Sequence, residues 1–373
     1  MTPGLTWARV RAWRVARQRL DERVPKPRLL DVVREVCGLH AQVPSSAELQ
    51  AWARVEGVTA EDVREALWER RTLVRTWAMR GTLHVLSADD LPLYVGALRT
   101  HDRWWKGAWL RMIGFSEPEL RSILDAIHRS LGARPITRER LTEKVAALVG
   151  PRARERMGSG WGEMLKPAAF AGSLVSGPPR GQNVTFVRPD RWLKAWAVPE
   201  PDEAWREVVR RYLRIYGPAT REEFARWWGM QPATAGRILK ASADELEEVE
   251  VEGDAAWALA GDAAAMQKAR LRSPARLLPA FDVYVAGTRP KASLVDRRFE
   301  ARVFRQAGWI TPVVLVDGMV AGVWGQERRG AEIEVAVEPF GSLSAARRRE
   351  VVEEVDRLGA FLGGPARVTW VRR

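Results

Sequence analysis

Cysteine and histidine are scarce in this 373-residue chain, and their scarcity excludes several kinds of site. The one cysteine, Cys37, has no second cysteine with which to form an internal disulfide. The four histidines, His40, His84, His101 and His128, are scattered, and no HxxEH, CxxC or EF-hand spacing is present. We therefore expect no metal site.

Long apolar runs and nucleotide-binding loops are also missing. No stretch approaches the roughly 18 apolar residues that a transmembrane helix requires. Arginines interrupt every apolar segment near the N-terminus, so no signal peptide is predicted. Neither a Walker loop nor a GxGxxG motif occurs. We expect a cytoplasmic, nucleoid-associated protein with no cofactor and no membrane partner.

Charge, in contrast, is plentiful and of unequal sign. Lys and Arg number 60 against 47 Asp and Glu, which gives a net charge of +13. A field of that sign favours polyanions, so the predicted partner is double-stranded DNA. The high share of Arg is explained equally well by phosphate recognition and by the codon usage of a GC-rich genome. Basic residues also outnumber acidic ones between Met1 and Ala41.

One pattern of helices and strands occurs three times along the chain. In each copy, amphipathic helix signals are followed by two short strand signals around a turn that contains glycine. The strand pairs read LVRTWAMRGTLHVL from Leu73, LVSGPPRGQNVTFV from Leu174 and LEEVEVEGDAAWAL from Leu246. Identity between the copies is low, so the repeat lies in the order of hydrophobic periods and turns.

A helix-turn-helix signature precedes each strand pair. In the third copy, Thr220 is predicted to cap a helix that stops at Gly229, and residues 232–241 form the next helix. The corresponding helices are 46–54 and 59–70 in the first copy, and a helix from Thr137 through Val145 and then 161–172 in the second. Helices followed by a hairpin indicate a winged helix, whose third helix commonly enters a DNA groove.

The expected fold class is α+β, with three tandem winged-helix motifs and a C-terminal β-barrel-like domain. Residues 1–110 hold a basic N-terminal helix and the first winged helix, 111–200 the second, 201–265 the third and 266–373 the C-terminal domain. Strands are predicted there at 277–285, 301–305, 309–316, 319–324, 332–337 and 366–371, with a hairpin at Asp317-Gly318 and a helix at 345–362. This order favours a small barrel capped by one helix.

Four runs of the chain carry a family resemblance. They are GLHAQVPSSAELQAWAR from Gly38, VRTWAMRGTLHVLSADD from Val74, LLPAFDVYVAG from Leu277 and WITPVVLVDGMVAGVW from Trp309. Together they resemble the tandem winged-helix DNA glycosylases of the AlkZ/YcaQ type, over nearly the whole chain. The resemblance implies a C-shaped molecule around a DNA channel that removes alkylated bases, in some cases from interstrand crosslinks. Its QΦQ or QΦD catalytic motif matches His40, Ala41 and Gln42, so the motif here reads HΦQ.

The side chains of His40 and Gln42 suit hydrolysis of the N-glycosidic bond to an N7-alkylated purine. Alkylation makes the base a good leaving group, so the enzyme needs to hold a water against C1′ and stabilise an oxocarbenium-like sugar. The Gln42 carbonyl accepts from that water, and His40 orients it or acts as a weak base. Alternatively, the helical spacing of Leu29, Val33, Val36 and His40 makes His40 a structural histidine at the buried end of a helix.

A second cluster of predicted DNA-binding residues lies on the first wing. It consists of Arg75, Arg80, Thr82 and His84. In an alternating strand, residues 80, 82 and 84 share one face. This polar strip binds the phosphates beside the lesion, braces His40, or is a solvated outer face.

A turn at residues 306–308 is the last candidate. It lies between Arg305 and Trp309, and a hairpin here would probe the minor groove of DNA, with Gln306 and Trp309 as the predicted DNA-binding residues. The alternative is a plain surface turn.

The competing function is that of a non-catalytic DNA-binding protein, such as a transcriptional regulator. Regulators usually pair one winged helix with a dimerisation surface, because palindromic half-sites require two-fold symmetry. Three unlike copies in one chain instead suit a monomer that grips one stretch of DNA. A family member inactivated by the change from Gln to His is a third possibility. The lesion, base flipping and the choice between general repair and self-resistance of a toxin producer stay open.

Overall fold

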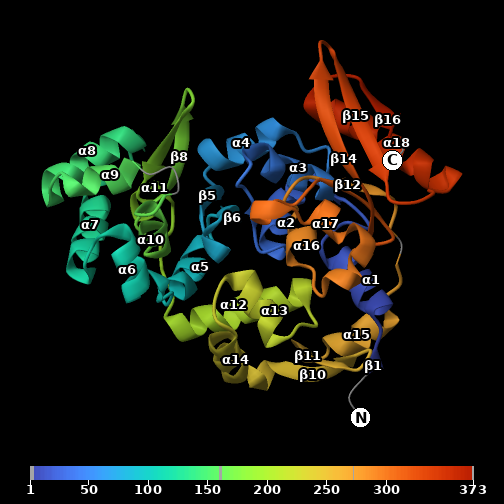
Figure 1. Cartoon of the computed structure of the whole chain (residues 1–373), viewed down its shortest axis with the longest axis horizontal. Helices are drawn as coiled ribbons and strands as arrows, with labels where there is room; N and C mark the ends of the chain where they lie inside the picture. Colours follow the sequence, from blue (N-terminus) through green and yellow to red (C-terminus); the bar gives the residue numbers. More distant parts are fainter. Residues whose placement is uncertain (1–3, 159–161, 272, 372–373) are drawn as a thin grey trace. The chain divides into compact units, whose positions relative to one another are not determined.

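The computed structural model describes residues 4–158, 162–271 and 273–371 (Figure 1). Their contacts divide them into two compact units. The first holds the described residues of 1–63, 209–227 and 231–373, and the second holds those of 64–208 and 228–230. Helices and strands are both present, which confirms the α+β class. Among the described residues, no helix is long and apolar enough to cross a membrane.

Short helices joined by very short strands make up the N-terminal part of the first unit. Thr6 caps the first helix by accepting from the Arg9 N–H at 3.3 Å. Arg14 on the same helix is buried and donates to the carbonyl oxygens of Arg289 and Pro218 at 2.6 and 2.8 Å. The elements are β1 Gly4–Leu5, α1 Trp7–Arg17, β2 Val24–Pro25, α2 Leu29–Glu35, β3 Leu39–His40, α3 Pro44–Arg54, β4 Val55–Glu56 and then α4 Ala60–Trp68.

The third copy of the repeat has the predicted order of elements. Its members are α12 Pro201–Tyr216, α13 Arg221–Trp228, α14 Pro232–Ala241, β10 Leu246–Val251 and β11 Asp254–Leu259, followed by α15 Asp262–Lys268. Thr220 and Glu223 form the predicted cap of α13, with reciprocal hydrogen bonds of 2.8 and 3.2 Å. The N-terminal β1 pairs in parallel with β10, and Leu5 packs with Val249 and Val251 in one core. Sequence analysis did not predict that pairing.

The second unit contains the strands of the first two copies. Its elements are β5 Leu73–Trp77, β6 Leu83–Ser87, α5 Leu91–Leu98, α6 Gly107–Ile113, α7 Glu117–Ser130, β7 Ile136–Thr137, α8 Arg138–Val149, α9 Arg152–Gly158, α10 Leu165–Phe170, β8 Val175–Arg180, β9 Asn183–Val187 and α11 Pro189–Trp192. β5 pairs antiparallel with β6, and β8 with β9. The predicted helix 161–172 is found as α10, and Trp161 lies outside the described residues.

All three predicted strand pairs are therefore confirmed, and so are their turns. Gly81, Gly181 and Gly253 have φ angles of 68, 60 and 97°. These angles lie in the left-handed region that glycine adopts without a steric cost. The description of the three patterns as winged helices stays a prediction.

The C-terminal segment forms an open sheet, and the predicted β-barrel is wrong. Its strands are β12 Arg276–Leu278, β13 Val313–Val316, β14 Met319–Arg329, β15 Glu332–Pro339 and β16 Ala366–Trp370, in that spatial order. β15 and β16 are parallel, so their connection crosses over one face of the sheet as α18 Ala345–Leu362. That helix packs against both edge strands, β16 and β12, and lies against the sheet (Figure 1).

Two predicted strands in this segment are also wrong. Of 277–285, only the start belongs to β12, and α16 Val283–Gly287 follows. Asp282 is the reason, because its side chain accepts from the Tyr284 N–H at 2.9 Å and caps α16. The predicted strand 301–305 is replaced by α17 Glu300–Val303. Short apolar runs of this kind do not distinguish a strand from a buried helical turn.

The predicted Asp317-Gly318 hairpin is confirmed between β13 and β14. Asp317 and Gly318 have φ angles of 50 and 70°. Positive φ at both central residues is the geometry of a type I′ turn, which Asp-Gly favours.

Candidate active site

The HΦQ segment lies between α2 and α3 and is not helical. Helix α2 ends at Glu35, and the left-handed residues Cys37 and Gly38, with φ angles of 61 and 92°, turn the chain into β3. His40 is the last residue of β3, and Gln42 lies in the bend before α3. The helical spacing that ran through His40 in the sequence is therefore misleading, because the helix stops five residues earlier.

The two predicted catalytic side chains differ in exposure. His40 is only 4 % exposed, whereas Gln42 is exposed. A buried imidazole thus lies two residues from a solvent-facing amide. Of the two side chains, Gln42 is therefore the one more accessible to water and to a ligand.

Gln50 on α3 holds the backbone of His40. Its Oε1 accepts from the His40 and Val283 N–H groups, both at 3.3 Å. Its Nε2 donates to the His40 carbonyl at 2.9 Å and to the Ser46 carbonyl and hydroxyl at 3.2 and 3.1 Å. A side-chain amide offers two donors and one carbonyl acceptor. Both polar backbone groups of His40 are therefore bound by one buried side chain, which also binds the C-terminal segment.

Two aromatic side chains, Phe281 and Trp309, form a row of ring contacts with the imidazole of His40. Phe281 stacks face to face on it, with ring centroids 4.9 Å apart and planes 10° apart. Trp309 packs edge-on against Phe281, at 4.9 Å and 74°. Trp309 is 44 % exposed. The rings lead from a buried imidazole to an indole at the surface, and we call these three residues the aromatic stack.

A buried ion pair joins α3 to the residue after Phe281. Both side chains, Arg54 and Asp282, have zero exposure, and two hydrogen bonds of 2.8 Å link them. Arg54 also donates to the Gln50 carbonyl at 3.0 Å and to Gln18 Oε1 at 3.3 Å. A bidentate pair of this kind fixes geometry strongly, since breaking it leaves a charge without compensation.

The predicted turn at residues 306–308 ends just before Trp309. It is a tight turn and not a hairpin. Ala307 and Gly308 have φ angles of 54 and 74°. The Arg305 N–H donates to the Trp309 carbonyl at 2.8 Å, and the Trp309 N–H to the Gln306 carbonyl at 3.2 Å. One isolated bridge, Phe304 to Ile310, closes the turn. The turn is confirmed, but it has no flanking strands, so the suggested hairpin is wrong. Gln306 is exposed.

The residues of the first wing do not share a strand face. Arg80 has a φ of 59° and lies in the turn Met79–Gly81, and Thr82 follows it before β6 begins. The Thr82 hydroxyl donates to the Met79 carbonyl at 3.1 Å. His84 lies in β6, is 2 % exposed, and its Nδ1 is 3.0 Å from the Thr82 carbonyl. The predicted strip is wrong at Arg80, where the turn interrupts the alternation, and His84 is buried and not on a solvated face.

Arg75 is the fourth wing residue and lies on β5. It is half-buried, and burial lowers the pKa of its guanidinium. Of the four wing residues, Arg80 and Thr82 are the two at the turn.

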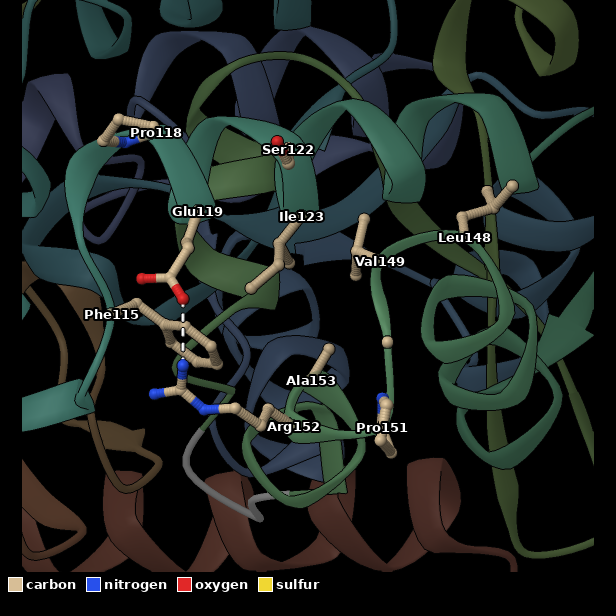
Figure 2. Close-up of a pocket in the computed structure, with 11 residues that line it drawn as sticks. Phe115, Pro118, Glu119, Ser122, Ile123, Leu148, Val149, Pro151, Arg152 and Ala153 are labelled. Carbon is tan, nitrogen blue, oxygen red and sulfur yellow. Dashed lines mark hydrogen bonds and ion pairs between the residues drawn. The ribbon is translucent and has the colours of Figure 1, made fainter.

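A pocket of about 470 Å³ lies elsewhere, among residues of α7, α8 and α9 (Figure 2). Phe115, Ile123 and Val149 line it, and Arg152 donates to Glu119 at 2.9 Å across one side. No predicted site residue lines this pocket. Within the described ranges, no group of three or more His, Cys, Asp or Glu side chains could hold a metal ion.

Sequence analysis missed Gln50, Arg54, Phe281 and Asp282. The available signal was the spacing of Gln50 and Arg54, four residues apart on a helix whose intervening residues are apolar. Two polar side chains on one helical face among buried neighbours indicate an internal polar network. No comparable signal marks Phe281, whose contact with His40 joins residues far apart in the chain.

Comparisons with known proteins identify the family of the chain. Residues 33–361 match the family model described as "DNA glycosylase AlkZ-like". The "Interstrand DNA cross-link repair glycosylase" of Streptomyces sahachiroi is 37 % identical over 342 residues, covering 90 % of this chain and 91 % of that protein. The solved structure of "Streptomyces sahachiroi DNA glycosylase AlkZ" matches with a TM-score of 0.88 and 35 % identity, over 98 % of this chain and 100 % of that one. The chain therefore belongs to the family of AlkZ-like DNA glycosylases.

Proposed function

We propose that this protein is a monofunctional glycosylase that hydrolyses the N-glycosidic bond of N7-alkylated purines in duplex DNA, with bulky and interstrand-crosslinked purines among its substrates. Membership of the AlkZ-like family supports base excision. The name of the Streptomyces sahachiroi relative supports crosslinks as a substrate class. We further propose that it acts as a monomer on the nucleoid.

The observation that carries the assignment of the site is the setting of His40 and Gln42. The His40 ring is buried against Phe281 and its backbone is bound by Gln50, whereas Gln42 is exposed. A catalytic group needs a fixed geometry and access to the reacting atoms. His40 supplies the fixed group and Gln42 the accessible one.

The chemistry required of these two residues is modest. N7 alkylation gives the purine a positive charge, so the C1′–N9 bond breaks with the electron pair moving to the base, which leaves neutral. A water molecule adds to C1′ and loses one proton. We propose that the Gln42 carbonyl accepts a hydrogen bond from this water and that His40 orients it and accepts the proton. The Gln42 amide then donates to a sugar or phosphate oxygen.

The predicted DNA contacts are proposed with different roles. Arg80 and Thr82 at the wing turn, and Gln306 and Trp309 at the 306–308 turn, are proposed to touch DNA. Each of these residues lies at a turn, and Trp309 presents an exposed ring on which a base can stack. Arg75 and His84 are more buried. We propose that they support the wing beneath those contacts.

Base excision assays test the proposal directly. Duplexes that carry one N7-methylguanine, or one interstrand crosslink between guanine N7 atoms, are incubated with the protein and then with alkali, which cleaves abasic strands. Cleavage by the wild type and its loss in Gln42→Ala are expected. Binding without cleavage of either duplex would favour the non-catalytic alternative, and an obligate dimer in gel filtration would favour a regulator.

A further inference from the structure

We infer that Phe281 is a positioning residue for His40, and that it sets the plane of the imidazole for the hydrolysis proposed above. The inference rests on the proposed function, since it assumes that His40 takes part in the reaction. It assigns a role in catalysis to the C-terminal turn 280–283. None of its side chains needs to touch the substrate.

The first support is the geometry of the stack. The rings of Phe281 and His40 are nearly parallel, 10° apart, with centroids at 4.9 Å. Trp309 also packs against Phe281, with ring centroids 4.9 Å apart and planes 74° apart. A ring in contact with two aromatic neighbours is restricted in orientation, and a parallel ring stacked on it loses freedom to rotate about χ2. Phe281 therefore selects one plane for the imidazole.

The second support is the conformation of Phe281 itself. Its φ angle is 59°, in the left-handed region where a bulky residue is strained. Strained residues persist where their surroundings fix them, and they gather at functional sites. Here Ser46 donates from its hydroxyl to the Ala280 carbonyl, and the Phe281 N–H donates to the Ile310 carbonyl at 3.3 Å. The turn is thus fastened at residues 280 and 281.

The third support is that helix α3 binds both the backbone of His40 and the residues that follow Phe281. Gln50 on α3 binds the N–H and carbonyl of His40 and the N–H of Val283. One turn further along α3, Arg54 binds Asp282 in the buried ion pair. The backbones that carry the two rings are therefore fixed to one rigid element. A side chain whose only purpose was to fill space would not need its backbone fixed in this way.

The consequence is a specific loss when the Phe281 ring is removed. In Phe281→Leu, His40 keeps its backbone contacts but its ring gains alternative orientations. Misplacing a catalytic group by about 1 Å costs up to about 100-fold in rate. We expect single-turnover excision of N7-methylguanine to slow by about 10- to 100-fold. The affinity for the duplex should fall less than the excision rate, because Phe281 does not contact DNA in this proposal and only its neighbour Trp309 does.

Three variants make the test selective. Phe281→Tyr keeps the ring and should excise nearly as fast as the wild type. Phe299→Leu is the matched control, because Phe299 and Phe340 form another stacked pair, 4.3 Å and 12° apart, with no histidine between them. It should lower the melting temperature without slowing excision. If Phe281→Leu does not fold, Phe281→Met serves in its place.

A double-mutant cycle with His40→Ala separates positioning from a general structural effect. If Phe281 acts through His40, adding Phe281→Leu to His40→Ala should not slow excision further. In NMR spectra, the His40 ring protons should move downfield in Phe281→Leu, because they lose the ring current of the stacked phenyl group. The chain has four histidines, and His40→Gln assigns the signal.

The outcomes distinguish this inference from the proposed function. A slow His40→Ala with a Phe281→Leu that excises at the wild-type rate would overturn the positioning role alone. So would a Phe281→Leu effect of the same size with and without His40. A His40→Ala that excises at the wild-type rate would overturn the role of His40, and the role of Phe281 with it.

Discussion

The two buried histidines of the candidate sites are held in different ways. His84 lies on the strand after the wing turn, and its ring nitrogen is 3.0 Å from the carbonyl of Thr82, two residues away. His40 stacks on Phe281, more than two hundred residues away in the chain, and Gln50 on the next helix binds its backbone. Both are almost fully buried, at 2 and 4 % exposure.

The difference supports the proposal that His40 takes part in the reaction and that His84 does not. The contact of His84 with Thr82 lies within one hairpin. A contact between segments far apart in sequence fixes an orientation only once the whole unit has folded, and such fixed groups are what a catalytic site requires. We therefore assign the reaction to His40 and a supporting role to His84, and the following variants are designed to break that contrast.

The largest effect is expected from breaking the buried ion pair. Arg54→Leu leaves the Asp282 carboxylate buried without its partner, and such losses cost about 3–5 kcal/mol of folding free energy. Urea unfolding measures it. Arg121→Leu is the control, since Arg121 pairs with Glu117 on the surface, where ion pairs contribute little. Equal effects of the two variants would contradict the structural role of the pair.

Gln42→Ala should lower the rate of base excision and not the folding stability. Losing one group that stabilises the transition state slows a reaction by about 10²–10³-fold. Single-turnover excision and duplex affinity are measured together, and the affinity should hardly change. Gln326→Ala, which removes another exposed glutamine of the same unit, should excise normally. If Gln42→Ala excises the base as fast as Gln326→Ala, Gln42 is not part of the site.

Substituting each histidine tests the contrast itself. His40→Ala should slow excision by more than tenfold, and His40→Gln, which restores the family motif, should keep substantial activity. His84→Ala should instead lower the melting temperature, because it empties a buried position, and excision below that temperature should continue. If His40→Ala has a lowered melting temperature but excises at the wild-type rate, both histidines have only a structural role. That result would refute the proposed role of His40 in the reaction.

The smallest effect concerns phosphate contacts at the wing. If Arg80 meets one phosphate, the slope of log affinity against log salt for undamaged duplex should flatten by about one in Arg80→Ala. Thr82→Ala removes no charge and should leave the slope as in the wild type. Fluorescence anisotropy across a salt series measures both. A slope unchanged in Arg80→Ala would remove Arg80 from the DNA surface.

The sequence predicted what depends on local chemistry. The Asp317-Gly318 hairpin, the cap at Thr220 and the three strand pairs were found because turn glycines, capping residues and period-two patterns act over a few residues. The candidate residues His40 and Gln42 came from a motif. Their helical context was wrong, although Gly38, with a φ angle of 92°, is a helix-stop signal of the same kind as Gly229.

The remaining errors involve contacts made over long distances in the chain. The C-terminal barrel was predicted from strand signals alone, but the parallel pairing of β15 with β16 requires α18 to cross the sheet. The strand predicted at 277–285 failed at Asp282, whose role as a cap and as the partner of Arg54 depends on another segment. Phe281 was missed for the same reason.

Release of the free base distinguishes hydrolysis at His40 and Gln42 from DNA binding alone. A duplex with one N7-methylguanine is incubated with excess wild-type protein and with His40→Ala/Gln42→Ala, and free N7-methylguanine is quantified by mass spectrometry together with the alkali-labile strand. We predict equal amounts of free base and abasic strand from the wild type and almost none from the double variant, although both bind the duplex. Equal base release by the two proteins would contradict the assignment of the reaction to His40 and Gln42.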